Sequence, residues 1–95
     1  MSADSAKMSV HVLMYCTASC PYCQAAERLL VRKGVSAIER VRVDLDPARR
    51  AEMTQKSGQR TVPQIWIGER HVGGCDELHE LERAGELDRL LGAAA

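Results

Sequence analysis

The 95-residue sequence has no net charge and no long apolar run. Its 13 Lys and Arg side chains balance 13 Asp and Glu side chains, which argues against bulk electrostatic attraction to nucleic acid or to an anionic membrane. No apolar stretch approaches the roughly 18 residues that a membrane-spanning helix needs. We therefore expect neither a nucleic acid nor a membrane as a partner.

Cysteine is scarce as well, with four residues of which three lie between positions 16 and 23. They are too few and too clustered for a disulfide-scaffolded secreted domain. Residues 1–9 hold one Lys and no apolar run, so the sequence predicts no secretory signal. We expect a cytoplasmic protein, in a reducing compartment where a cysteine pair is catalytic or metal-binding rather than structural.

The most informative motif present is Cys20-Pro21-Tyr22-Cys23. Two cysteines three apart can meet when the chain between them forms the first turn of a helix. Pro21 suits the first helical position, and this places Cys20 at the N-cap. There its sulfur would face unpaired backbone N–H groups and the positive end of the helix dipole, which favour the thiolate. The motif predicts a nucleophile and a resolving thiol within four residues.

The length indicates one domain, with residues 1–8 as a tail, 9–92 as the domain and 93–95 as a second tail. Apolar periodicity and turn signals place the motif directly after a strand and at the start of a helix. The predicted elements are strands over 10–15, 40–45, 63–67 and 70–72, helices over 21–33 and 47–56, and a last helical region from about 75 to 91, interrupted near Gly85. In the second strand, Val41, Val43 and Leu45 are expected on one buried face.

This order, β-α-β-α-β-β-α, predicts an α/β protein with a four-stranded mixed sheet flanked by helices. The first helix would cross over between two parallel strands in the right-handed sense. The thiols then lie at the carboxyl end of the first strand, where open α/β sheets place their sites.

Three motifs in this order, Cys20-Pro21-Tyr22-Cys23, Thr61-Val62-Pro63 and Gly73-Gly74-Cys75-Asp76, resemble the small dithiol glutaredoxins. The resemblance covers about Ser9 to Leu91 and implies the thioredoxin fold. It implies that Cys20 is the nucleophile and Cys23 the resolving thiol, and that no metal is needed. The implied function is glutathione-dependent reduction of protein disulfides and protein–glutathione mixed disulfides, in electron transfer and cell redox homeostasis.

The resemblance also implies where glutathione binds as a co-substrate. Pro63 would follow a cis bond that exposes the Val62 backbone, and this backbone would pair with the cysteine of glutathione like an added strand. Gly74, Cys75 and Asp76 would hold the γ-glutamyl end through helix N-terminal N–H groups and a carboxylate. Two other predicted contacts are Tyr22, expected to be exposed between the thiols, and Thr61.

Thr17 is one departure from the family pattern, which often has Lys or Arg at this position, three residues before the first motif cysteine. That cation would pair with the glycyl carboxylate of glutathione. Gln59 and Arg60 are the available substitutes. The expected partners are glutathione and disulfide-containing or glutathionylated proteins, with ribonucleotide reductase a family expectation, and the protein is expected to be a monomer.

Other interpretations stay open at this point. The chain could be an iron–sulfur carrier that shares a glutathione-ligated cluster between two subunits, or a redoxin driven by thioredoxin reductase. A zinc site would need more ligands than the spacing offers, and a radical-enzyme cluster on Cys16, Cys20 and Cys23 would need a far larger barrel. Cys16 is expected to be a small apolar residue at a strand end, and Tyr15 and Trp66 are expected to pack.

Overall fold

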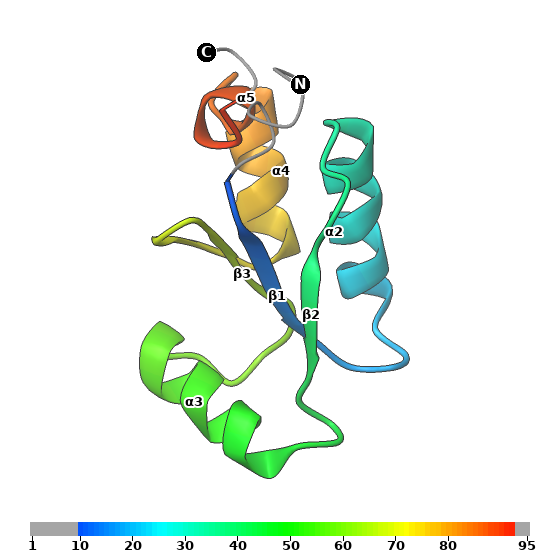
Figure 1. Ribbon diagram of the computed structural model, residues 1–95, viewed down its shortest axis with the longest axis vertical. Coiled ribbons are helices and arrows are strands. Elements are labelled where there is room, and N and C mark those ends of the chain that lie inside the picture. The colour runs from blue at the N-terminus through cyan, green and yellow to red at the C-terminus, as the bar shows by residue number, and fades with distance from the viewer. Residues whose placement is uncertain (1–9, 93–95) are drawn as a thin grey trace, which may run out of the picture.

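A computed structural model describes residues 10–92, which form one four-stranded sheet with helices on both faces (Figure 1). The sheet order is β2-β1-β3-β4, with β1 and β2 parallel and the other two pairs antiparallel. The predicted element order and mixed sheet are therefore observed. The elements are β1 (Val12–Cys16), α2 (Pro21–Arg32), β2 (Glu39–Arg42), α3 (Pro47–Ser57), β3 (Gln64–Ile67), β4 (Arg70–Gly73), α4 (Cys75–Arg83) and α5 (Leu87–Leu90).

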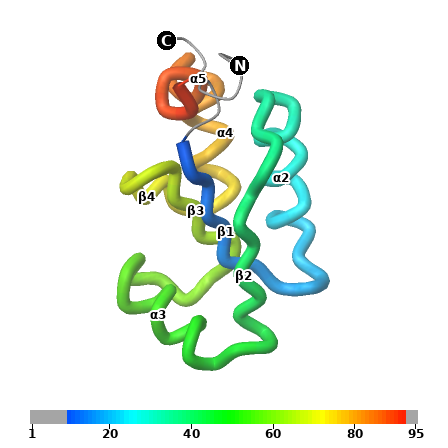
Figure 2. Tube along the Cα trace, viewed as in Figure 1, coloured from blue at the N-terminus to red at the C-terminus, as the bar shows by residue number. Residues whose placement is uncertain are grey.

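The two faces of the sheet bury different kinds of side chain. Alternate residues of β1 and β3 point to opposite faces. On one face an aliphatic core joins the sheet to α2 and α4; it includes Met14, Leu29, Ile65 and Leu78. On the other face α3 lies alone, as Figures 1 and 2 show, and the smaller core contains Tyr15, Val41, Val43, Met53 and Trp66. The predicted packing of Tyr15 and Trp66 is confirmed.

Helices α2 and α3 both begin with a capping residue followed by proline, as the sequence predicts. Cys20 caps α2, and Asp46 caps α3 by accepting hydrogen bonds from the backbone N–H groups of Ala48 and Arg49. A proline in the first turn costs no hydrogen bond, because the N–H groups there have no partner within the helix. Helix α3 ends at Ser57, and the next residue, Gly58, has a left-handed φ of 74°. These local rules fix where both helices start.

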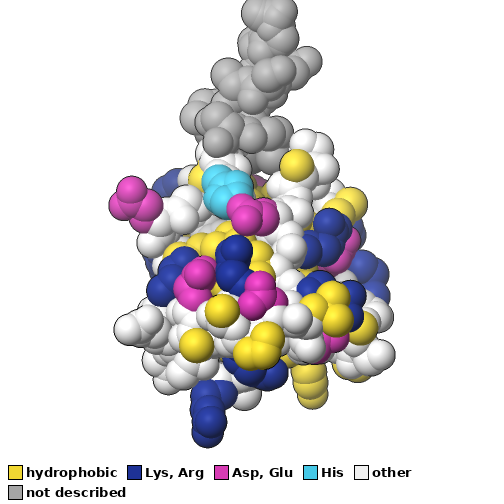
Figure 3. Space-filling view, turned by 60° about the horizontal axis from the view of Figure 1, so that its bottom comes forward, with side chains coloured by type: hydrophobic (Ala, Val, Ile, Leu, Met, Phe, Trp, Pro, Cys, Tyr) yellow, Lys and Arg dark blue, Asp and Glu magenta, His cyan; other side chains and the backbone are white. Residues whose placement is uncertain are grey.

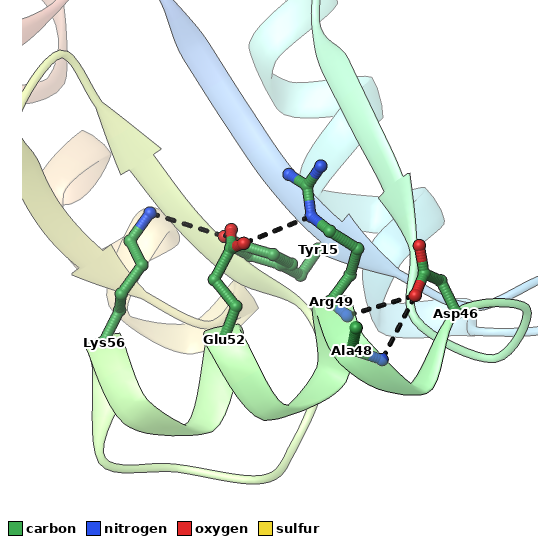
Figure 4. A network of polar contacts seen from close by, with 6 residues as sticks. All are labelled: Tyr15, Asp46, Ala48, Arg49, Glu52 and Lys56. Carbon is green, nitrogen blue, oxygen red and sulfur yellow. Dashed lines mark hydrogen bonds and ion pairs between the residues drawn. The ribbon is translucent and has the colours of Figure 1, made fainter.

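Polar contacts hold α3 to the sheet (Figure 4). The buried Tyr15 hydroxyl donates to the Glu52 carboxylate and lies 3.4 Å from Lys56 Nζ. Arg49 Nε lies 3.5 Å from Glu52 Oε1. Burial and the nearby Glu52 carboxylate raise the pKa of Tyr15, so the phenol stays protonated and remains a donor. Helix α3 leads directly into the loop that precedes β3, and these contacts therefore also position that loop.

The predicted second strand is wrong at its carboxyl end. Strand β2 stops at Arg42, and Leu45 is 71% exposed rather than buried. Val43 donates a last backbone bond to the Cys16 carbonyl, and the chain then turns, with Leu45 N–H donating to the Arg42 carbonyl. The apolar alternation continues past the end of the strand to Leu45, so periodicity alone could not show where pairing ends.

The carboxyl-terminal helical region is divided as predicted. Helix α4 ends at Arg83, Gly85 has a left-handed φ of 77°, and α5 begins at Leu87. Leu87 and Leu91 are buried against the aliphatic core. None of the helices described is long and apolar enough to cross a membrane. The two predicted tails, 1–8 and 93–95, lie outside the described residues.

Candidate active site

Cys20 lies between β1 and α2, and its sulfur is next to the first backbone N–H groups of α2. The backbone N–H of Cys23 donates to Cys20 Sγ over 3.2 Å, and Cys20 is only 7% exposed. The start of α2 thus directs a backbone N–H donor and the positive end of the helix dipole at this sulfur. The sequence-predicted placement of Cys20 at the N-cap is confirmed.

Cys23 is the second thiol of the motif, and it is buried as well. It is 4% exposed, and burial, followed by the hydrogen bond with Cys20, raises the pKa of its thiol to about 12. A thiol with this pKa stays protonated at neutral pH and is a poor initial nucleophile. The geometry therefore gives the two thiols different roles, with Cys20 able to attack first and Cys23 kept in reserve.

The loop before β3 passes beside Cys20. The peptide bond between Val62 and Pro63 is cis, as expected from the family resemblance. The Val62 carbonyl oxygen lies 3.9 Å from Cys20 Sγ. The loop and the thiol are thus in contact although they are 42 residues apart in the chain.

Most of the predicted glutathione contacts meet around one hollow of about 230 Å³ next to this loop. We call its two sides the loop wall, residues 59–63, and the α4 wall, residues 74–77. The hollow is lined by Tyr22, Gln59, Thr61, Val62, Pro63, Gln64, Gly74, Cys75, Asp76 and Glu77. Tyr22 stands at its edge and is 65% exposed, as its place between the thiols predicts.

The α4 wall is built from the first turn of α4. Glu77 Oε1 accepts a hydrogen bond from the Gly74 backbone N–H over 2.8 Å, which fixes the helix start. Asp76 is exposed in the same turn. A helix N-terminus with a carboxylate beside it can bind a carboxylate through N–H groups and an ammonium through the acid.

Gln64 and Glu77 line the hollow and are absent from the sequence-based site. Glu77 could have been found from the spacing, because an acid three residues after a helix cap forms a capping box. Gln64 could have been suspected as a polar residue within an apolar strand, since buried polar groups need partners. Arg60, offered with Gln59 as a substitute for a cation at position 17, lines a separate depression beside Arg50 and α3.

The two remaining cysteines are both buried. Cys16 ends β1 and is 5% exposed, as predicted for a small apolar residue at a strand end, and burial raises the pKa of its thiol. Cys75 Sγ lies 3.4 Å from His79 Nδ1, and burial raises its pKa too. All four cysteines are unbridged.

The surface of the protein carries charges of both signs. Figure 3 shows acidic and basic side chains interspersed with apolar ones on the face that it presents, and not a block of one sign. Within residues 10–92, no group of three or more His, Cys, Asp or Glu side chains is arranged to hold a metal ion. The reactive groups that the site presents are its thiols, which lie beside the hydrogen-bond donors of the two walls.

Known proteins are similar to this chain in sequence and in architecture. The glutaredoxin family model matches residues 12–72. A glutaredoxin from Pseudomonas aeruginosa is 60% identical over 82 residues, which cover 86% of this chain and 96% of the relative. The solution structure of a glutaredoxin from Brucella melitensis is 46% identical with a TM-score of 0.78, covering 94% of this chain and 95% of the other.

A crystal structure of a buckwheat glutaredoxin–glutathione complex is also similar. It is 31% identical with a TM-score of 0.80, and the match covers 96% of this chain and 84% of that one. These likenesses confirm the thioredoxin fold that the sequence resemblance implied. With its thiol pair at a helix start, the chain belongs to the glutaredoxin family and is a thiol–disulfide oxidoreductase.

Proposed function

We propose that this protein is a glutathione-dependent oxidoreductase that reduces protein–glutathione mixed disulfides and protein disulfides. One observation carries the proposal: the residues expected to bind glutathione, although spread from Tyr22 to Asp76, line one hollow that adjoins Cys20. The similar buckwheat structure, a glutaredoxin–glutathione complex, supports glutathione as the ligand of this hollow.

In the monothiol route, the Cys20 thiolate attacks the glutathione sulfur of a mixed disulfide. The S–S bond of the substrate breaks, the protein thiolate leaves and takes up a proton, and Cys20 carries the glutathionyl group. A glutathione thiolate then attacks this new bond. The products are glutathione disulfide and a restored Cys20 thiolate, so glutathione supplies both electrons.

In the dithiol route, Cys20 attacks a protein disulfide and Cys23 resolves the mixed disulfide. Cys23 must lose its proton as it attacks Cys20, because its buried thiol is protonated at neutral pH. The Cys20–Cys23 bridge is then reduced by two glutathione molecules. Transfer of electrons to protein disulfides, with ribonucleotide reductase as one candidate, would serve redox homeostasis in the reducing cytoplasm.

In this scheme the two walls of the hollow hold opposite ends of glutathione. The N–H groups at the start of α4 and the Asp76 carboxylate fit the γ-glutamyl α-carboxylate and ammonium. The Val62 backbone fits the cysteine residue of glutathione as an added strand would. The glycyl carboxylate is left for the loop wall, where Gln59 lies.

The test is reduction of a peptide–glutathione mixed disulfide, with glutathione and glutathione reductase as the electron supply. We expect wild type and Cys23→Ser to be active and Cys20→Ser to be inactive, because only the first thiol is needed in the monothiol route. Activity in Cys20→Ser would contradict the assigned nucleophile. A wild type that turns over with thioredoxin reductase but not with glutathione would instead support the redoxin interpretation.

A further inference from the structure

Gln64 is the one buried polar residue among those that the structure describes. It is 1% exposed and is the first residue of β3. A buried amide is costly unless its donors and acceptor are all paired. The Gln64 amide meets this requirement. Its partners are His71 of β4 on one side and Gln59 and Thr61 of the loop wall on the other.

The orientation of the Gln64 amide is set by chemistry. Its Nε2 lies 3.0 Å from the Thr61 carbonyl oxygen, and a carbonyl can only accept a hydrogen bond. The NH₂ group therefore faces the loop wall, and Oε1 faces β4. There His71 Nε2 lies 2.8 Å from Gln64 Oε1, so His71 must be the donor.

The His71 end of this chain of contacts is held in place by packing. The imidazole stacks on the Trp66 ring with centroids 4.5 Å apart and an interplanar angle of 31°. Burial lowers the pKa of His71, so the ring is neutral at pH 7. A neutral ring that donates from Nε2 has one fixed tautomer.

The fixed orientation of the Gln64 amide also determines the orientation of the Gln59 amide. The second N–H of Gln64 donates to Gln59 Oε1 over 3.1 Å, which occupies the oxygen side of an otherwise exposed side chain. The NH₂ group of Gln59 must then be turned away from Gln64. Within residues 10–92 no hydrogen bond uses this NH₂ group, and Gln59 lines the hollow.

We infer that Gln64, held by His71, is a positioning residue that orients Gln59 so that its NH₂ group donates to the glycyl carboxylate of glutathione. This inference rests on the proposed function and adds to it a reason why the site would prefer a ligand with a free glycyl carboxylate. The hydrogen bonds run in one direction, from His71 to Gln64 to Gln59 to the ligand, and aligned chains of this kind polarise one another. An oriented neutral donor thus stands in for the cation that is missing at Thr17.

The test compares two peptide mixed disulfides, one with glutathione and one with its glycyl monoethyl ester, which lacks the terminal carboxylate. The quantity measured is the ratio of kcat/KM for the acid to kcat/KM for the ester. Because hydrogen bonds to charged groups are the strong ones, we expect a wild-type ratio of about 10. A third substrate, N-acetylated at the γ-glutamyl amine, reports on the α4 wall alone.

Two variants interrupt this chain of hydrogen bonds, the relay from His71 through Gln64 to Gln59, at different points. Gln64→Met keeps the size of the side chain but removes its hydrogen-bond donor and acceptor. The Gln59 amide is then no longer held in one orientation, and we expect the ratio to fall to about 1 or 2. Gln59→Glu keeps the acceptor for Gln64 but turns an oxygen toward the ligand, so the ratio should fall below one. Gln59 is exposed, so this variant should fold even if Gln64→Met does not. Gln55→Met, an exposed glutamine on α3, is the matched control.

A general structural role for Gln64 predicts a different pattern. If Gln64→Met only loosened the site, discrimination against the N-acetylated substrate would fall together with that against the ester, whereas the relay predicts that it is kept. A folded Gln64→Met that retains the wild-type acid-to-ester ratio would overturn the inference, as would a wild type with no preference for the acid. A wild type that turns over none of the three substrates would instead refute the proposed function.

Discussion

The two walls of the hollow are built on different physical grounds. The α4 wall presents backbone N–H groups and the carboxylates of Asp76 and Glu77, all within a single helical turn. The loop wall presents a side-chain amide whose direction depends on Thr61, Gln64 and His71. One wall follows from local sequence, whereas the other depends on contacts between a loop and two strands. Residues that bind one ligand can therefore differ greatly in how well the sequence predicts them.

The contrast predicts that the largest single effect lies on the α4 wall. Asp76→Asn removes the charge that would pair with the γ-glutamyl ammonium, and charged hydrogen bonds contribute about 1.5–3 kcal/mol. We expect kcat/KM for a glutathione mixed disulfide to fall roughly 10- to 100-fold. Glu80→Gln, an exposed acid farther along α4, is the control and should be neutral. An equal loss with the N-acetylated substrate would show that Asp76 does not act on the ammonium.

The two walls touch at Gly74, which gives the next prediction. A Cβ at this position would lie 3.3 Å from the Pro63 carbonyl oxygen and 3.3 Å from Glu77 Oε1. Overpacking typically costs about 1–3 kcal/mol, so Gly74→Ala should lower the free energy of unfolding by about 1 kcal/mol or more. Urea denaturation measures this, with the exposed Ser36→Ala as a control. Unchanged stability would mean that the walls adjust independently of each other.

A smaller effect is expected from the cap of the α4 wall. Glu77→Ala leaves the Gly74 N–H without its 2.8 Å partner, and a typical hydrogen bond contributes about 1 kcal/mol. Glu77→Gln keeps an acceptor oxygen and should retain most of that stability. The free energies of unfolding of the two variants, measured side by side, decide the point. Equal losses would show that the charge and not the hydrogen bond matters.

The smallest effect should come from the pH response of His71, which contacts the loop wall through Gln64. Burial lowers the pKa of His71 in the folded state, so between its folded and unfolded pKa values the unfolded chain binds more protons. The free energy of unfolding therefore falls as the pH drops below about 6.5, by no more than about 1.4 kcal/mol per pH unit.

Substitution of His71 tests this directly. His71→Gln should lose this part of the acid sensitivity between pH 7 and pH 5, although it also loses the stacking on Trp66 at every pH. His11→Gln, at an exposed residue beside Glu39, is the matched control. The same acid dependence in His71→Gln and wild type would show that His71 does not titrate differently in the two states.

Much of the molecule is predictable because its rules are local. The starts of α2 and α3 follow from a cap and a proline, and the break before α5 falls where Gly85 adopts a left-handed φ. The carboxyl end of β2 is not predictable in this way. Leu45 continues the alternation of the strand, but the chain has already turned away from β1, and only the pairing partner decides where a strand ends.

The sequence by itself determined the thiol pair at a helix start, the order of the elements and the α4 wall, since these depend on residues within one or two turns of each other. Only the tertiary structure decided that Cys23 is buried enough to hold its proton, that the Val62 carbonyl lies beside Cys20, and that Gln64 turns Gln59 toward the hollow. Burial and hydrogen-bond direction depend on groups brought together from separate elements. A linear pattern specifies the donors and acceptors, but it does not specify which of them will face one another.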